Sequence, residues 1–135
     1  MIETQETICR WMNETFPGID PESPRKSLRA LEEMVELCLA SGATPNQIRE
    51  LVEKCLHKRS SGPGVAWRDE SYRDWIGVPA EAADVLIVLF GVAGMRRFDL
   101  DAEVDKKMAI NRARTWAPRG DGTGYHVKGS EAGGK

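Results

Sequence analysis

Two groups of acidic residues have the spacing that a metal site requires. Glu32, Glu33 and Glu36 form an E-E-x-x-E pattern, and Glu81 and Asp84 form an E-x-x-D pattern further along the chain. Side chains three or four residues apart share one side of a helix, so each group can present its carboxylates together. Carboxylates gathered at the edge of a helical core repel one another and lose hydration unless a cation neutralises them. The spacing therefore predicts a divalent metal site.

The ligand chemistry indicates a hard cation. Ligation by oxygen alone suits Mg²⁺, with Mn²⁺ as a substitute, and disfavours zinc. The two histidines, His57 and His126, lie outside both acidic groups, and the E-x-x-H motif of di-iron helical bundles is missing. We therefore expect magnesium, and not a di-iron centre.

The alternative for the first acidic group is a solvated helix surface. No basic residue stands four positions after Glu32 or Glu36 to neutralise either of them. In the second group only alanines separate Glu81 from Asp84, and the apolar run 85–90 follows directly. These features favour the metal site over the solvated surface.

A third polar set, spaced K-x-x-x-N-x-x-R, follows near the end of the predicted helical region. Lys107, Asn111 and Arg114 fall on roughly one face of a helix and supply two cations and an amide. Such groups bind phosphate oxygens well. The alternative is a solvated face that pairs with Glu103 and Asp105, but beside a carboxylate-bound metal the phosphate interpretation is favoured.

The elements that must position these residues are helices, because strand signals are almost absent. Ser-Pro and Thr-Pro pairs mark the starts of the second and third helices, and Asp99 or Asp101 caps the last. The apolar run 85–94 is too short to span a bilayer and predicts a central helix buried on most sides. The predicted helices cover residues 4–15, 24–41, 45–58, 79–97 and 100–116.

The composition is that of a single globular domain followed by a tail. The chain has 135 residues and a formal net charge of −2, which argues against a duplex nucleic acid partner. Six of the 18 residues from Pro118 onward are glycine. We therefore expect a helical domain over residues 1–117 and a tail over 118–135 that is flexible or is ordered only by a partner.

The compartment expected from the sequence is the cytoplasm. The chain opens Met-Ile-Glu and shows no signal peptide, and no membrane partner is expected. Cys9, Cys38 and Cys55 are odd in number and form no C-x-x-C pair. They are interpreted as reduced and mostly buried thiols.

In this order, the three polar patterns resemble those of the MazG-like, all-α nucleoside triphosphate pyrophosphohydrolases. The Ser-Pro-Arg run at residues 23–25, followed by Leu28 and Leu31, is also similar to the deoxycytidine-triphosphatase branch. The resemblance covers residues 23–116. It implies an all-α, four-to-five-helix bundle that assembles as a homodimer or homotetramer, in a bacterial or phage-infected cytoplasm.

The resemblance also implies an activity. Mg²⁺-dependent enzymes of this kind hydrolyse a nucleoside triphosphate to the monophosphate and pyrophosphate, and so clean or remodel a deoxynucleotide pool. Glu32 or Glu36 is then the candidate base that activates water. Carried over by position, the residues implied are Glu33, Glu36, Glu81 and Asp84 as metal ligands, Glu32 as an outer ligand or water-orienting group, and Lys107, Asn111 and Arg114 as phosphate-binding groups.

The base-binding residues are less well defined by the sequence. Trp11 and Phe16 correspond to the region that contacts the base in the deoxycytidine-triphosphatase relatives, and Trp67 and Trp75 lie in an unusually long segment between the acidic groups. For any single aromatic residue the alternative is core packing. Stacking alone does not distinguish bases, so the expected substrate is a deoxynucleoside triphosphate with purines slightly favoured.

Two other functions fit parts of the sequence. Phosphoribosyl-ATP pyrophosphohydrolase shares the pattern of Glu81 and Asp84 before an apolar helix, but Asn111, Arg114 and the long N-terminal part favour the nucleotide-pool enzyme. A non-catalytic helical interaction protein, whose acids only keep it soluble, is hard to reconcile with carboxylates that lead into an apolar helix.

Overall fold

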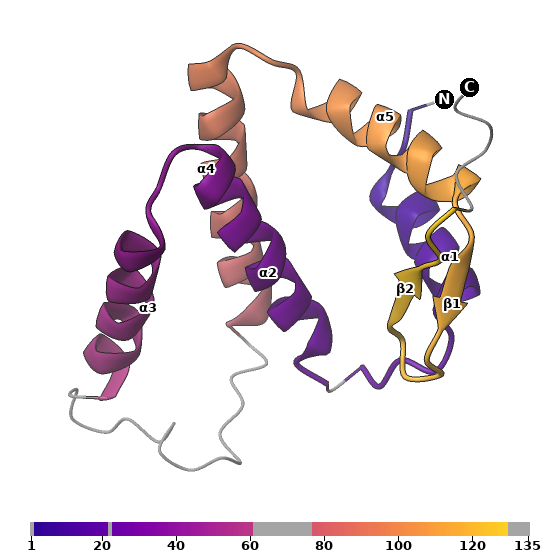
Figure 1. Cartoon of the computed structure of the whole chain (residues 1–135), viewed down its shortest axis with the longest axis horizontal. Helices are drawn as coiled ribbons and strands as arrows, with labels where there is room; N and C mark the ends of the chain where they lie inside the picture. Colours follow the sequence, from indigo (N-terminus) through magenta and orange to yellow (C-terminus); the bar gives the residue numbers. More distant parts are fainter. Residues whose placement is uncertain (1, 22, 61–76, 130–135) are drawn as a thin grey trace. The chain divides into compact units, whose positions relative to one another are not determined.

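The computed structural model describes residues 2–21, 23–60 and 77–129, which are mostly helical, as predicted (Figure 1). These residues contain five α-helices and one antiparallel two-stranded hairpin. In chain order the elements are α1 (Gln5–Thr15), α2 (Arg25–Ala40), α3 (Pro45–Ser60), α4 (Val78–Arg96), α5 (Leu100–Ala113), β1 (Trp116–Pro118) and β2 (Gly124–His126).

The chain divides into two compact units. One combines Met1–Ser23 with Ala83–Lys135, and the other is Pro24–Ala82. The boundary falls inside α4, so this helix contributes residues to both units. The first unit contains α1, α5 and the hairpin, and the second contains α2 and α3.

Helix α1 begins where the sequence predicts. Thr4 and Thr7 form a reciprocal capping box, in which the Thr7 amide donates to Thr4 Oγ1 (3.2 Å) and the Thr4 amide donates to Thr7 Oγ1 (2.8 Å). These bonds satisfy two of the amide groups that a helix start leaves without a partner. Phe16 ends the helix, and its amide donates to the carbonyl of Met12.

Helices α2 and α3 are consecutive and in contact with each other. The start of α2 differs slightly from the prediction, because Pro24 and not Ser23 occupies the N-cap position and no side chain caps the helix. Thr44 caps α3 as predicted, with its Oγ1 accepting from the Gln47 amide and its own amide donating to Gln47 Oε1. Gly42, at a φ of 98°, makes the turn between the helices that an L side chain rarely allows.

The prediction of burial for the apolar helix is wrong within the single chain. In α4 only Ala93 is buried, while Ile87 is 64% exposed and Val88 is 58% exposed. Helix α4 is long and apolar enough to cross a membrane, but the core helix of a soluble protein can have the same length and composition. Nothing within the described residues covers most of this apolar surface, and apolar surface of that kind normally marks an interaction site.

Helix α5 begins at the predicted cap and ends earlier than predicted. Asp99 accepts from the Ala102 amide (3.1 Å), whereas the last helical residue is Ala113 and Trp116 already belongs to β1. The indole Nε1 of Trp116 donates to the carbonyl of Asn111 (2.7 Å). The Arg114 amide also donates to this carbonyl (3.3 Å), so two donors satisfy it where the helix ends and the chain turns toward the strand.

The hairpin replaces the first part of the expected flexible tail. Trp116 pairs with His126 and Pro118 pairs with Gly124 across the two strands. The glycines that suggested flexibility have structural roles: Gly122 adopts a φ of 82°, and its amide donates to the carbonyl of Pro17 (3.0 Å). Residues 130–135 of the expected tail lie outside the described residues.

An aromatic cluster holds the hairpin against the end of α1, and Figure 1 shows these elements side by side. Phe16, 9% exposed, lies edge-on to Trp11 and to Trp116, with ring centroids 5.7 and 5.3 Å away. His126 tilts against Trp116 at 5.9 Å. Gly124 lies so close that a Cβ added there would be 2.6 Å from the Phe16 ring.

The three cysteines are free thiols, as expected, but they are not mostly buried. Cys9 and Cys55 are exposed and Cys38 is intermediate. Among the described residues, too little structure covers these positions to bury them.

The close contact at Gly124 generates a prediction about stability. Gly124→Ala should lower the free energy of unfolding by about 1–3 kcal/mol, because the added methyl group collides with Phe16 and the structure must shift. Denaturant unfolding followed by tryptophan fluorescence measures this change. As a control, Gly91→Ala on α4, where nothing lies within 4 Å of the added Cβ, should stabilise the helix by roughly 0.5–1 kcal/mol. An unchanged midpoint for Gly124→Ala would show that the hairpin does not pack on α1.

Candidate metal and phosphate site

The first acidic group lies on the surface of α2, where Glu32, Glu33 and Glu36 are all exposed. Arg29, one turn earlier on the same helix, pairs with Glu32 (2.6 Å) and with Glu33. The hydrogen bond to Glu32 is the largest cause of a raised pKa for Arg29, and the charges of all three glutamates add to it. The three glutamates therefore stabilise the positive charge of Arg29.

The sequence interpretation overlooked Arg29. It considered basic residues only after each glutamate, whereas Arg29 stands three positions before Glu32 and four before Glu33. Ion pairs form in both directions along a helix surface, so the pattern was visible in the sequence. Glu36 lies beyond this pair and is exposed.

The second acidic group lies at the start of α4. Glu81 is in the first turn, where the helix dipole favours a negative charge. Asp84 follows one turn later and is also exposed. The boundary between the two units passes between these residues, with Glu81 in the unit of α2 and Asp84 in the unit of α5.

The residues present fit a hard divalent ion by donor type. All five acidic residues offer carboxylate oxygens at helical spacing, and they are accessible from solvent. Within residues 2–21, 23–60 and 77–129, no group of three or more His, Cys, Asp or Glu side chains is close enough to hold one metal ion. Arg29 already contacts one expected ligand, Glu33, so an ion at this position must compete with the guanidinium.

The expected phosphate-binding residues lie at and beyond the end of α5. Lys107 is exposed and Asn111 is half-buried one turn later. Arg114 is the C-cap residue of α5, with φ −80° and ψ 152°, so the third member of the set lies just past the last helical residue and the chain leaves the helix there. In the alternative interpretation this set pairs with Glu103, whereas in the structure Glu103 accepts from Lys106 (2.6 Å).

The four base-binding candidates have different surroundings. The ring of Phe16 is buried by the edge-on contacts described above, which leaves little of its face for stacking. Trp11 is only half-buried. Trp67 and Trp75 lie outside the described residues.

The similarity to known proteins is partial. No family model matches the chain, and no solved structure matches it. Over 53 residues, 39% of this chain, the sequence is 42% identical to a protein named dATP/dGTP diphosphohydrolase from Cyanophage S-2L. The matched part spans half the length of that relative. The match therefore supports a relation to the nucleotide pyrophosphohydrolases in general.

Competition between Arg29 and a metal ion can be measured. Arg29→Gln should lower the Mn²⁺ concentration for half-saturation by about three- to fivefold, because two exposed helix pairs worth roughly 0.3–0.5 kcal/mol each no longer oppose binding. Isothermal calorimetry with Mn²⁺ gives this constant. Arg10→Gln, which removes an exposed pair with Glu6 on α1, is the matched control and should have no effect. Equal or weaker Mn²⁺ binding by Arg29→Gln would contradict a role for Glu33 as a ligand.

Proposed function

We propose that this protein is a divalent-metal-dependent diphosphohydrolase of deoxynucleoside triphosphates, which releases the monophosphate and pyrophosphate. The observation that carries this proposal is the 42% identity over 53 residues with a phage dATP/dGTP diphosphohydrolase. The acidic groups of α2 and α4 and the polar set of α5 support it, because they supply the oxygen ligands and phosphate-binding groups that such a reaction uses.

The metal-binding part of the proposal assigns Glu33, Glu36, Glu81 and Asp84 as ligands of Mg²⁺, for which Mn²⁺ substitutes. The ion supplies charge neutralisation of the triphosphate and makes the α-phosphorus more electrophilic. Carboxylates favour this role because a hard cation prefers oxygen ligands.

The remaining roles belong to side chains of the chain itself. A carboxylate oxygen of Glu36, or of Glu32, accepts the proton of the water that attacks the α-phosphate in line. The Lys107 ammonium, the Asn111 amide and the Arg114 guanidinium bind phosphate oxygens and stabilise the pyrophosphate as its charge develops. These three side chains contribute through their position and charge, so each must be held at a fixed position relative to the phosphates.

The proposed substrates are purine deoxynucleoside triphosphates. The name of the phage relative, dATP/dGTP diphosphohydrolase, supports the purine preference. Among the described aromatic residues, Trp11 retains more exposed surface than Phe16 and is the better candidate for stacking on the base.

The proposal includes self-association through α4. Ile87 and Val88 are among the exposed apolar residues of this helix, and exposed apolar surface on this scale is costly in water. A second copy of the chain offers the same apolar surface, as the symmetric interface of a homodimer requires. A homotetramer would pair two such dimers.

If Glu36 is the general base and Asp84 is a metal ligand, replacing either residue should reduce activity. Glu36→Gln and Asp84→Asn should each reduce pyrophosphate release from dATP by about 10²–10⁴-fold, because a proton acceptor or a metal ligand is lost. Both residues are exposed, so circular dichroism and the unfolding midpoint should stay unchanged. Glu53→Gln, which alters an exposed glutamate on α3, should retain full activity.

The same assay distinguishes the competing functions. With Mg²⁺, pyrophosphate release should be fastest for dATP or dGTP among the four common deoxynucleoside triphosphates and phosphoribosyl-ATP. Faster hydrolysis of phosphoribosyl-ATP would support the enzyme of histidine synthesis instead. Full activity of Glu36→Gln or Asp84→Asn would refute the residue assignment, and no turnover of any nucleotide would refute the function.

The self-association proposal makes a separate prediction. The chain should elute as a dimer or tetramer in size-exclusion chromatography with light scattering, and Ile87→Glu should shift it toward the monomer by placing a charge in the interface. Val127→Glu, at a 38% exposed apolar residue just after the hairpin, should leave the oligomer intact. A monomer at high concentration for the unaltered chain would contradict the proposal.

A further inference from the structure

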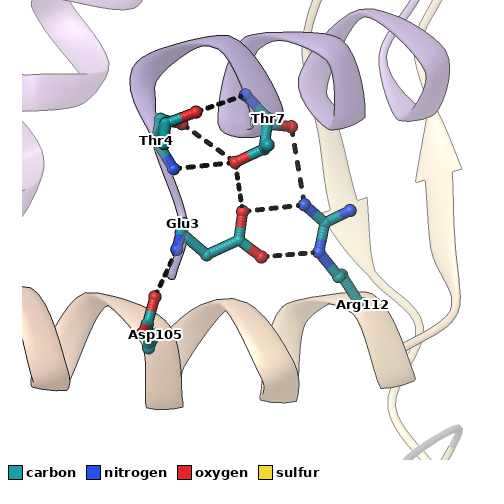
Figure 2. Close-up of polar contacts among 5 residues, drawn as sticks. All are labelled: Glu3, Thr4, Thr7, Asp105 and Arg112. Carbon is teal, nitrogen blue, oxygen red and sulfur yellow. Dashed lines mark hydrogen bonds and ion pairs between the residues drawn. The ribbon is translucent and has the colours of Figure 1, made fainter. Parts of the chain in front are cut away.

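A network of polar contacts ties the segment before α1 to helix α5 (Figure 2). The Glu3 carboxylate accepts from Nε and Nη2 of Arg112, both at 2.9 Å, and from Thr7 Oγ1 at 2.6 Å. The Glu3 amide donates to Asp105 Oδ1 (2.5 Å), so Glu3 contacts α5 at two points two turns apart. The two residues of the ion pair are 109 positions apart in the sequence.

The Glu3–Arg112 ion pair is more buried than the ion pairs of Arg10 and Arg29. The Glu3 side chain is only 4% exposed, whereas both members of the Arg10–Glu6 pair are well over half exposed. The bidentate geometry fixes the direction of the guanidinium as well as its distance. Hydrogen bonds from Arg112 and Thr7 lower the pKa of Glu3, and the bond to Glu3 raises the pKa of Arg112, so both stay charged at neutral pH.

Arg112 lies between two of the proposed phosphate-binding residues. Asn111 immediately precedes it, and Arg114 follows two residues later, just past the end of α5. The last turn of a helix has carbonyl groups without helical partners and tends to fray. Here the Arg112 pair and the bond from Trp116 Nε1 to the Asn111 carbonyl hold that turn from two sides.

We propose that Glu3 is a positioning residue for the triphosphate: through Arg112 it fixes the last turn of α5, so that Asn111 and Arg114 meet the phosphates in constant positions. This inference rests on the proposed function. Glu3 itself contacts neither the nucleotide nor the metal in this account. Misplacement of binding groups by about 1 Å weakens their contacts with the substrate, which makes the orientation of this helix end important for affinity.

The test compares Glu3→Gln with Glu6→Gln in the full chain. Glu3→Gln keeps the size of the side chain but removes the charge that holds Arg112, and should raise KM for dATP about tenfold with a smaller change in kcat. Glu6→Gln removes an exposed pair on the same segment of chain and should leave both constants unchanged. Both variants are assayed well below their unfolding midpoints, which are measured in parallel.

Further variants keep the inference falsifiable. Arg112→Lys keeps the charge but offers one donor group in place of two, so it should raise KM less than Glu3→Gln does, and it replaces that variant if Glu3→Gln does not fold. The double exchange Glu3→Arg with Arg112→Glu should recover most of the affinity, since it rebuilds the pair. A folded Glu3→Gln protein with a lower unfolding midpoint and an unchanged KM would show a purely structural tether and overturn the inference.

A binding measurement separates this inference from the proposed function. If the unaltered chain hydrolyses dATP but Glu3→Gln has the same KM, the inference fails and the function stands. If the unaltered chain hydrolyses no nucleotide, the function fails, and calorimetry with inorganic tripolyphosphate decides the inference. Weaker tripolyphosphate binding by Glu3→Gln would support it, and equal binding or none by both proteins would overturn it.

Discussion

The ion pair between Glu3 and Arg112 is the contact on which the unit containing α1, α5 and the hairpin depends. It joins residues 109 positions apart, and the Glu3 side chain is almost fully buried in it. Removing Arg112 would leave the largely buried Glu3 carboxylate with Thr7 as its remaining side-chain donor. The aromatic contacts of Phe16 and Trp116 bind the other end of α1 to the hairpin. Together these contacts fix the end of α5, where the proposed phosphate-binding residues lie.

The charges of the acidic side chains determine what the proposed reaction requires. The exposed glutamates of α2 are only partly neutralised by Arg29, and Glu81 and Asp84 add two more negative charges on α4. A triphosphate is itself highly anionic, so an enzyme that binds it beside carboxylates needs a divalent cation as well as basic side chains. In the proposed function, the carboxylates would hold the cation and the basic side chains would bind the phosphates.

The sequence predicted local structure better than packing. Helix starts at Thr4, Thr44 and Asp99 were predictable because each depends on a capping side chain within a few residues. The hairpin was not, since Gly122 and Gly124 indicate flexibility by composition and reveal their role only when Pro17 and Phe16 are placed beside them. The exposure of α4 could not be predicted for a similar reason. An apolar run indicates that a helix is buried, but not whether the same chain or another chain buries it.

For the candidate site too, the sequence predicted residue types better than their contacts. Its residue types and their spacing could be recognised in the sequence, and the spacing of Arg29 before Glu33 could have been, but the end of α5 before Arg114 could not be placed without coordinates. The most direct test of the central claim is a crystal structure of the protein with Mn²⁺ and a non-hydrolysable dATP analogue, using the anomalous signal of manganese to locate the ion. The account predicts a manganese peak bound by both Glu36 and Asp84 and by the triphosphate. A manganese ion that contacts only one of these two carboxylates, or neither, would contradict it.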